Sequence, residues 1–189
     1  MYKKNLKMVL GSIVLGALLI GCGGSGNDNQ QNCPRKALRA ERKALNMAFA
    51  QNKVVDFKIT LEKMAPGLIG EGSISEGTNK IAGVMTEDLS AAPKAVTLLN
   101  GARQSKKLTQ NQVTTLNTMV QDMTTDGVNK LEISGTVKQI VNTNNKEVTI
   151  TAAKLDGAAT DAPGIAALNG DNHLKAVLLQ RINRLLGVK

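Results

Sequence analysis

Two cysteines and one histidine, Cys22, Cys33 and His173, are the side chains of this chain best suited to chemistry. A thiolate can act as a nucleophile or bind a metal, and a histidine can act as a general base or a metal ligand. Because His173 is the only histidine of the sequence, any catalytic triad and any histidine-containing zinc site would depend on it. Catalysis also requires such a group to be positioned beside a partner residue and a substrate.

The spacings typical of catalytic and metal sites do not occur in the sequence. The four ligands of a structural zinc site cannot be assembled from Cys33 and His173 without carboxylates, and no D-x-[DN]-x-[DN]-G calcium loop is present. The segment Gly70-Glu71-Gly72 lacks the GxxxxGK[ST] spacing of a phosphate loop. We therefore predict no catalytic residue, no metal site and no cofactor, and we expect the protein not to be an enzyme.

Aromatic side chains are scarce, and this argues against several classes of ligand. Apart from Tyr2, the aromatic residues are Phe49 and Phe57, both at expected core positions. Single-stranded nucleic acids stack their bases on aromatic rings, and sugars commonly lie on such rings too. We expect no nucleic-acid partner. A pair of carboxylates for glycoside cleavage is not excluded by spacing, but the missing aromatic subsites argue against it.

The residues before Cys22 indicate what happens to its thiol. Three lysines lie within the first seven residues, an apolar run follows over 8–20, and the run ends at Leu19-Ile20-Gly21-Cys22. This layout is typical of a secretory signal peptide. The Leu-Ile-Gly-Cys ending resembles the lipobox of bacterial lipoproteins, in which a diacylglycerol is attached to the cysteine thiol and signal peptidase cuts just before that cysteine.

The resemblance implies that Cys22 is the lipidation site and that its acyl chains, palmitate among them, anchor the protein in a membrane. The apolar run is shorter than the roughly twenty residues of a spanning helix, which argues against an uncleaved anchor. In the enterobacterial pattern an aspartate after the cysteine retains a lipoprotein in the inner membrane. Gly23 therefore favours the cell outer membrane, with the protein facing the periplasm; exposure at the cell surface is the alternative.

Three segments follow from this interpretation: a signal peptide over 1–21, the acylated cysteine and a flexible tether over 22–33, and a single domain over 34–189. The tether sequence GGSGNDNQQN is polar and rich in glycine, and ten such residues have a reach of about 17 Å. Cys33 is left as an odd thiol, which either forms a disulfide to another chain or stays unpaired.

Positive charge is concentrated in two segments of the chain. The formal charge of +9 falls to +6 when residues 1–21, with three lysines and no acid, are removed. Residues 35–53 carry six basic residues and one acid, and residues 174–189 carry four basic residues and no acid. We expect both segments to be helical and, if they pack side by side, to form one basic patch for anionic lipid headgroups or an acidic partner. Solvated basic faces are the alternative.

Periodicity and turn signals predict an α+β fold. We expect an antiparallel sheet of about four to five strands in two hairpins, packed by about four helices. Glycines at 70, 72 and 83 suggest bulges or close backbone approach. A capping box at Thr109 and Gln112, with Leu108 stapled onto Val113, predicts the start of one helix. The expected helices cover 34–52, 90–100, 109–123 and 171–186, the expected strands cover 54–64, 68–75, 80–86, 131–137 and 148–152, and a long loop covers 156–170.

These observations predict a membrane-anchored cell-envelope lipoprotein that acts as a non-catalytic binding or scaffolding module with a basic face. Its expected partner is an envelope protein or anionic headgroups. The alternative is a periplasmic carrier of lipid or another small apolar ligand, suggested by the aliphatic stripes of the predicted helices and the small residues of the predicted strands.

Overall fold

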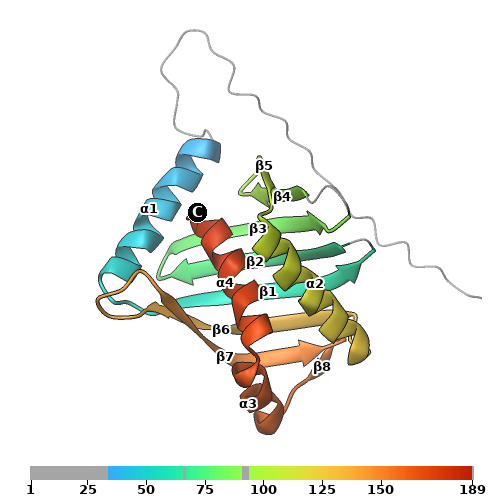
Figure 1. Cartoon of the computed structure of the whole chain (residues 1–189). Coiled ribbons are helices and arrows are strands. Elements are labelled where there is room, and N and C mark those ends of the chain that lie inside the picture. Colours follow the sequence, from blue (N-terminus) through green and yellow to red (C-terminus); the bar gives the residue numbers. More distant parts are fainter. Residues whose placement is uncertain (1–33, 66, 91–93, 189) are drawn as a thin grey trace, which may run out of the picture.

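The computed structural model describes residues 34–65, 67–90 and 94–188, so Cys22, Cys33 and the predicted tether lie outside the described residues. Within the described part, one antiparallel sheet of eight strands in the order β5-β4-β3-β2-β1-β6-β7-β8 carries a layer of helices (Figure 1). The elements are α1 (Pro34–Ala50), β1 (Val55–Met64), β2 (Gly67–Glu76), β3 (Asn79–Asp88), β4 (Lys94–Leu99), β5 (Ala102–Lys107), α2 (Gln110–Thr125), β6 (Lys130–Gln139), β7 (Lys146–Leu155), β8 (Ala158–Ala159), α3 (Ala162–Gly170) and α4 (Asn172–Leu186).

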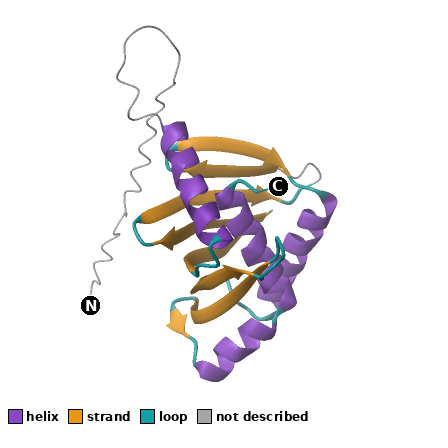
Figure 2. Cartoon of the chain, turned by 90° about the vertical axis from the view of Figure 1, so that its left-hand side faces the viewer, coloured by secondary structure: helices purple, strands orange, loops and turns teal. Residues whose placement is uncertain are grey.

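The sheet has one apolar and one polar face. In β1, Val55, Phe57, Ile59 and Leu61 are buried while the residues between them are exposed or half-buried. This period of two places every second side chain against the helices, as in an antiparallel sheet that is solvated on one side. The core is therefore the aliphatic layer between sheet and helices, and the two layers are seen beside each other in Figure 2.

The helices pack onto this apolar face through stripes of aliphatic residues at helical spacing. Helix α4 buries Leu174, Leu178, Ile182 and Leu185, as the sequence predicts. Helix α2 packs beside α4, and α1 runs past the strand ends from β6 to β5 (Figure 1). The capping box at Thr109 and the αL cap at Gly187 are both present, which confirms these predicted helix ends.

The predicted sheet of about four to five strands in two hairpins is wrong, since the sheet has eight strands. The segment 90–100, expected as a helix, contains β4, and the following residues form β5. Asn100 and Gly101 both have positive φ, at 45° and 79°, and make the two-residue turn between these strands. The Asn-Gly pair is a strong hairpin signal, yet 90–100 was predicted as a helix, for which a following glycine is a common end.

Physical reasons for this error lie in the composition of the two strands. Val96 and Leu99, three residues apart, fit a helical stripe, but the structure buries Ala95, Thr97 and Leu99 on alternate positions. Strand β5 (ARQSKK) carries no apolar alternation because it is an edge strand whose residues after Ala102 are exposed. Charged residues are common on such edges, where they oppose pairing with another chain.

The segment 156–170, expected as a long loop, contains β8 and α3. Asp161 caps α3 by accepting a hydrogen bond from the Gly164 amide, and Pro163 lies in its first turn. The described residues form four helices, which is the expected number. The segment 90–100 is not one of them, and the helix over 162–170 was not predicted. A bulge at Ser134/Gly135 also shifts the register between β6 and β7. The alternation of buried residues along β7 therefore changes, and the side chain of Ala153 is buried instead of that of Ala152.

Close approach of backbones explains two of the three strand glycines that the sequence singled out. A Cβ atom on Gly70 would lie 1.8 Å from the Thr60 carbonyl oxygen, and one on Gly83 would lie 2.0 Å from the Leu98 carbonyl oxygen. The atoms nearest to a Cβ on Gly72 would belong to side chains, those of Met85, Leu185 and Ile59. Gly72 thus leaves space for α4 to lie close to the sheet.

Candidate functional site

Basic side chains gather on the edge of the molecule formed by α1 and β5. Exposed residues of α1 and β5 supply seven of them, half-buried Arg42 supplies another, and Glu41 is the only acidic residue of the two elements. We call this surface the basic edge. It consists of Arg35, Lys36, Arg39, Arg42 and Lys43 of α1 and Arg103, Lys106 and Lys107 of β5.

Arg42 joins the two parts of the basic edge to α4. Its Nε donates to the carbonyl oxygen of Leu185 at 2.8 Å, and its Nη2 lies 3.4 Å from Gln104 Oε1 of β5. A cation at this position also compensates the free carbonyl groups at the C-terminal end of α4. Burial lowers the pKa of the Arg42 guanidinium below its ordinary value. The first and last helices therefore do lie in contact, as one of the sequence hypotheses required.

The two arginines of α4, however, contribute little to a surface patch. Arg181 is fully buried, and Arg184 is nearly so at 9 % side-chain exposure. Both donate to the carboxylate of Glu87 on β3, Arg181 at 2.7 Å and Arg184 at 2.5 Å. Of the four basic residues that the sequence hypothesis placed at 174–189, Lys175 is half-buried and Lys189 lies outside the described residues. Among the described residues, β5 brings three exposed basic side chains, which the sequence hypothesis did not include.

The Glu87 cluster (Glu87, Arg181, Arg184) is not electrically balanced. Two guanidinium groups face one carboxylate, and among the described residues Nε and Nη1 of Arg181 have no hydrogen-bond partner. Desolvation lowers the pKa of Arg181, although the neighbouring Glu87 opposes that effect. Since an arginine stays protonated in proteins, the cluster carries a net positive charge beneath the surface between α4 and β3.

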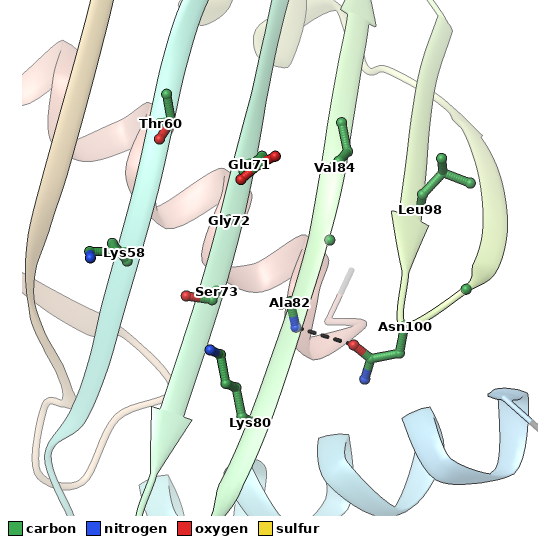
Figure 3. A pocket seen from close by; sticks show the side chains of 12 residues that line it. Lys58, Thr60, Glu71, Gly72, Ser73, Lys80, Ala82, Val84, Leu98 and Asn100 are labelled. Carbon is green, nitrogen blue, oxygen red and sulfur yellow. Dashed lines mark hydrogen bonds between the residues drawn. The ribbon is translucent and has the colours of Figure 1, made fainter. Parts of the chain in front are cut away.

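The face of the sheet opposite the helices is open and polar. Figure 3 shows a shallow pocket there, of about 450 Å³, with Lys58, Thr60, Glu71 and Ser73 on the side of the strands away from α4. A neighbouring pocket of about 480 Å³ shares Lys58 and Thr60 and includes Glu132. The hydrogen bond from Lys130 lowers the pKa of Glu132. Charges of both signs and short side chains line this face, which is not the lining expected for an apolar cargo.

His173 lies exposed in the first turn of α4, where its amide donates to Asp171. Within the described ranges, no three histidine, cysteine or acidic residues come together in a way that would hold a metal ion. Among the described helices, none has the length and the apolar character needed to cross a membrane.

Comparisons with known proteins give no family for this chain: no protein-family model matches it, and no curated protein is significantly similar to it in sequence.

Sequence reasoning missed the contribution of β5 to the basic edge and the role of Glu87. Lys106 and Lys107 are adjacent basic residues before a strong helix cap, but only recognition of the Asn100-Gly101 turn would have placed them on an edge strand. Glu87 and Arg181 lie 94 residues apart, and no local pattern relates them.

Proposed function

We propose that this protein is a lipid-anchored, non-catalytic binding module of the cell envelope, whose basic edge lies against anionic headgroups of the membrane that holds Cys22. One observation carries the proposal. Helix α1 and strand β5, which together carry seven exposed basic residues, lie in contact at one edge of the domain (Figure 1). Helix α1 begins at Pro34, directly after the predicted tether. Attraction to an anionic leaflet contributes about 1 kcal/mol for each basic residue near the surface.

This arrangement leaves the open face of the sheet free for an envelope protein. Lys58, Glu71 and Glu132 on that face offer charges of both signs, which favour specific polar contacts over uptake of an apolar molecule. The carrier of apolar ligands stays the alternative, and native mass spectrometry of the detergent-purified lipoprotein distinguishes the two, because a carrier retains lipid after detergent exchange.

Hydrogen exchange of the acylated protein in nanodiscs tests the membrane contact directly. We expect α1 and β5 to exchange more slowly in discs of phosphatidylglycerol than in discs of phosphatidylcholine, and we expect the difference to disappear at high salt because the contact is electrostatic. Reversing two exposed charges, Arg35→Glu with Arg39→Glu, removes the protection. The matched control is Lys58→Glu with Lys154→Glu on the open face, which should leave it unchanged. Equal exchange in both lipids would contradict the proposal.

A further inference from the structure

The two edges of the antiparallel sheet end in different ways. Strand β5 forms one edge, and five of its six residues are exposed. At the other edge, β8 pairs with only Lys154 and Leu155 of the ten residues of β7. Helix α3 lies beside this second edge, at the end of the sheet away from β5 (Figure 1). An edge strand with free N–H and C=O groups is a template on which another chain can add a strand, so the cover on β7 decides whether the sheet stops there.

Asn169 of α3 ends the sheet at Ile150. The backbone N–H of Ile150 donates to Oδ1 of Asn169 at 2.9 Å, and Nδ2 of Asn169 donates to the carbonyl oxygen of Ile150, also at 2.9 Å. Nδ2 donates in addition to the Ile165 carbonyl oxygen at 3.1 Å, which fixes the orientation of the amide. Two facing residues of an antiparallel ladder exchange the same pair of N–H···O bonds. The side-chain amide therefore occupies the place that a residue of a ninth strand would take.

Helix α3 has few other contacts that hold it on β7. None of its nine residues is buried, and Ile165 and Leu168 are only partly buried against the core. Just before the helix, the Thr160 amide donates to the Ala153 carbonyl oxygen at 2.9 Å. A segment with few buried apolar contacts opens locally at a low cost in free energy. The two hydrogen bonds between Asn169 and Ile150 are therefore important for keeping α3 closed over the edge.

We propose that Asn169 is an edge stop: it holds α3 as a strap over β7, and without it the β7 edges of two copies of this chain pair with each other. Alternate residues of a strand direct their N–H and C=O groups to the same side. Val148 and Lys146 therefore direct theirs to the same side as Ile150 does. Residues 146–150 then form a pairing segment, which a twofold axis places against the same segment of a second copy.

The charges of the two edges favour β7 as the place where copies would pair. In an antiparallel register centred on Val148, Lys146 faces Ile150 of the other copy and Glu147 faces Thr149, so no like charges are opposed. Pairing of β5 with itself would instead bring the basic side chains of two copies together, since ARQSKK has three cations and no acid. The edge stop does not depend on the proposed membrane contact, because β5 and β7 belong to opposite edges of the sheet.

Hydrogen exchange of the full-length acylated protein, in an excess of neutral detergent, tests the edge stop. In the wild type we expect slow exchange of the Ile150 amide that does not change with protein concentration. In Asn169→Ala we expect exchange about ten- to hundredfold faster at low protein concentration, the effect of losing two hydrogen bonds. At high concentration this amide should become protected again because the β7 edges pair, and native mass spectrometry should show a dimer.

A second variant and a matched control complete the experiment. Asn169→Leu keeps about the same side-chain volume and removes both hydrogen bonds; it should behave as Asn169→Ala does, and it replaces that variant if the alanine protein does not fold. Asn100→Gly is the control, because the Asn100 side chain also accepts from a strand amide, that of Ala82 at 3.4 Å, but lies at the turn between β4 and β5. Glycine keeps the positive φ of that turn, and the control should stay monomeric.

Three results would overturn the proposal. Wild-type exchange of Ile150 in both Asn169 variants would mean that other contacts hold α3. A folded Asn169→Ala protein that exchanges fast at every concentration and stays monomeric would mean that the β7 edge does not accept a second copy. An equal dimer in Asn100→Gly would mean that the association does not depend on the β7 edge.

Discussion

Glu87 is the residue whose removal should disturb this structure most. Its carboxylate is fully buried and holds two guanidinium groups. Glu87→Gln would leave both positive charges without an anion in the interior, and removing one partner of a buried ion pair typically destabilises by about 3–5 kcal/mol. We expect a loss of this size in the free energy of unfolding, measured by urea denaturation at pH 7.

The contrasting change is Arg181→Met, because it leaves Glu87 paired with Arg184 alone and removes a buried guanidinium that has two unpartnered nitrogens. We expect its free energy of unfolding to stay within about 1 kcal/mol of the wild type, since a well-packed apolar group can replace a buried charge at little cost. If Arg181→Met lowers the free energy of unfolding as much as Glu87→Gln does, all three side chains of the cluster are needed for stability. The explanation by charge balance would then be wrong.

Gly70 is a second residue whose substitution should clearly lower the stability of the protein. A methyl group there would meet the carbonyl oxygen of Thr60 on the neighbouring strand, so Gly70→Ala requires the strands to separate. We expect thermal and urea unfolding to show a destabilisation of about 1–3 kcal/mol, typical of overpacking. Gly170→Ala at the end of α3 is the control: a Cβ there has no atom within 4 Å, and the change should stabilise by about 0.4–1 kcal/mol.

At the scale of elements, α2 is the helix with the clearest local start signal. Thr109 and Gln112 exchange hydrogen bonds between side chain and backbone, and Leu108 and Val113 on either side are buried. Thr109→Ala should destabilise the protein by about 1 kcal/mol, as expected for the loss of an N-cap. Thr109→Ser should restore most of that loss. If Thr109→Ala unfolds at the wild-type urea concentration, the cap contributes nothing to stability.

Strand β5 shows how an element without an apolar pattern is held in place. Its pairing with β4 follows from the Asn100-Gly101 turn, and Arg42 of α1 lies against Gln104. Because only Ala102 of this strand is buried, its stability comes from backbone pairing with β4 and not from core packing. The same exposure leaves Arg103, Lys106 and Lys107 available on the surface, as the proposed membrane contact requires.

At the scale of the whole molecule, the central prediction concerns Cys22. Metabolic labelling with palmitate should label the wild-type protein, and Cys22→Ser should abolish the label, because the acyl chains are attached through the thiol. The variant should also keep residues 1–21, which intact-mass spectrometry detects, since the lipobox cysteine is needed for cleavage. Cys33→Ser is the matched control and should be labelled and processed normally. An unlabelled wild-type protein would contradict the anchor and with it the proposed orientation.

Local patterns in the sequence were sufficient for the elements that have strong local signals. The strict alternation of β1, the stripe of α4 and the capping box at Thr109 each arise from contacts within one element or to one apolar layer, so a short window of residues contains the information. The same holds for the glycine at 70, where only the absence of a side chain permits the close approach of strands.

The position of β5 and the environment of α4 were decided only by the tertiary structure. Strand β5 has no pattern of its own, and its partner β4 fits a helical period as well as a strand. Arg181 appears in the sequence as one more basic residue of the last helix. Its burial depends on Glu87, which the folded sheet brings to it from 94 residues away. Pairing of charges and of strands that lie far apart in the sequence depends on the whole arrangement of the chain. This is why the basic edge and the buried Glu87 cluster became visible only in the folded structure.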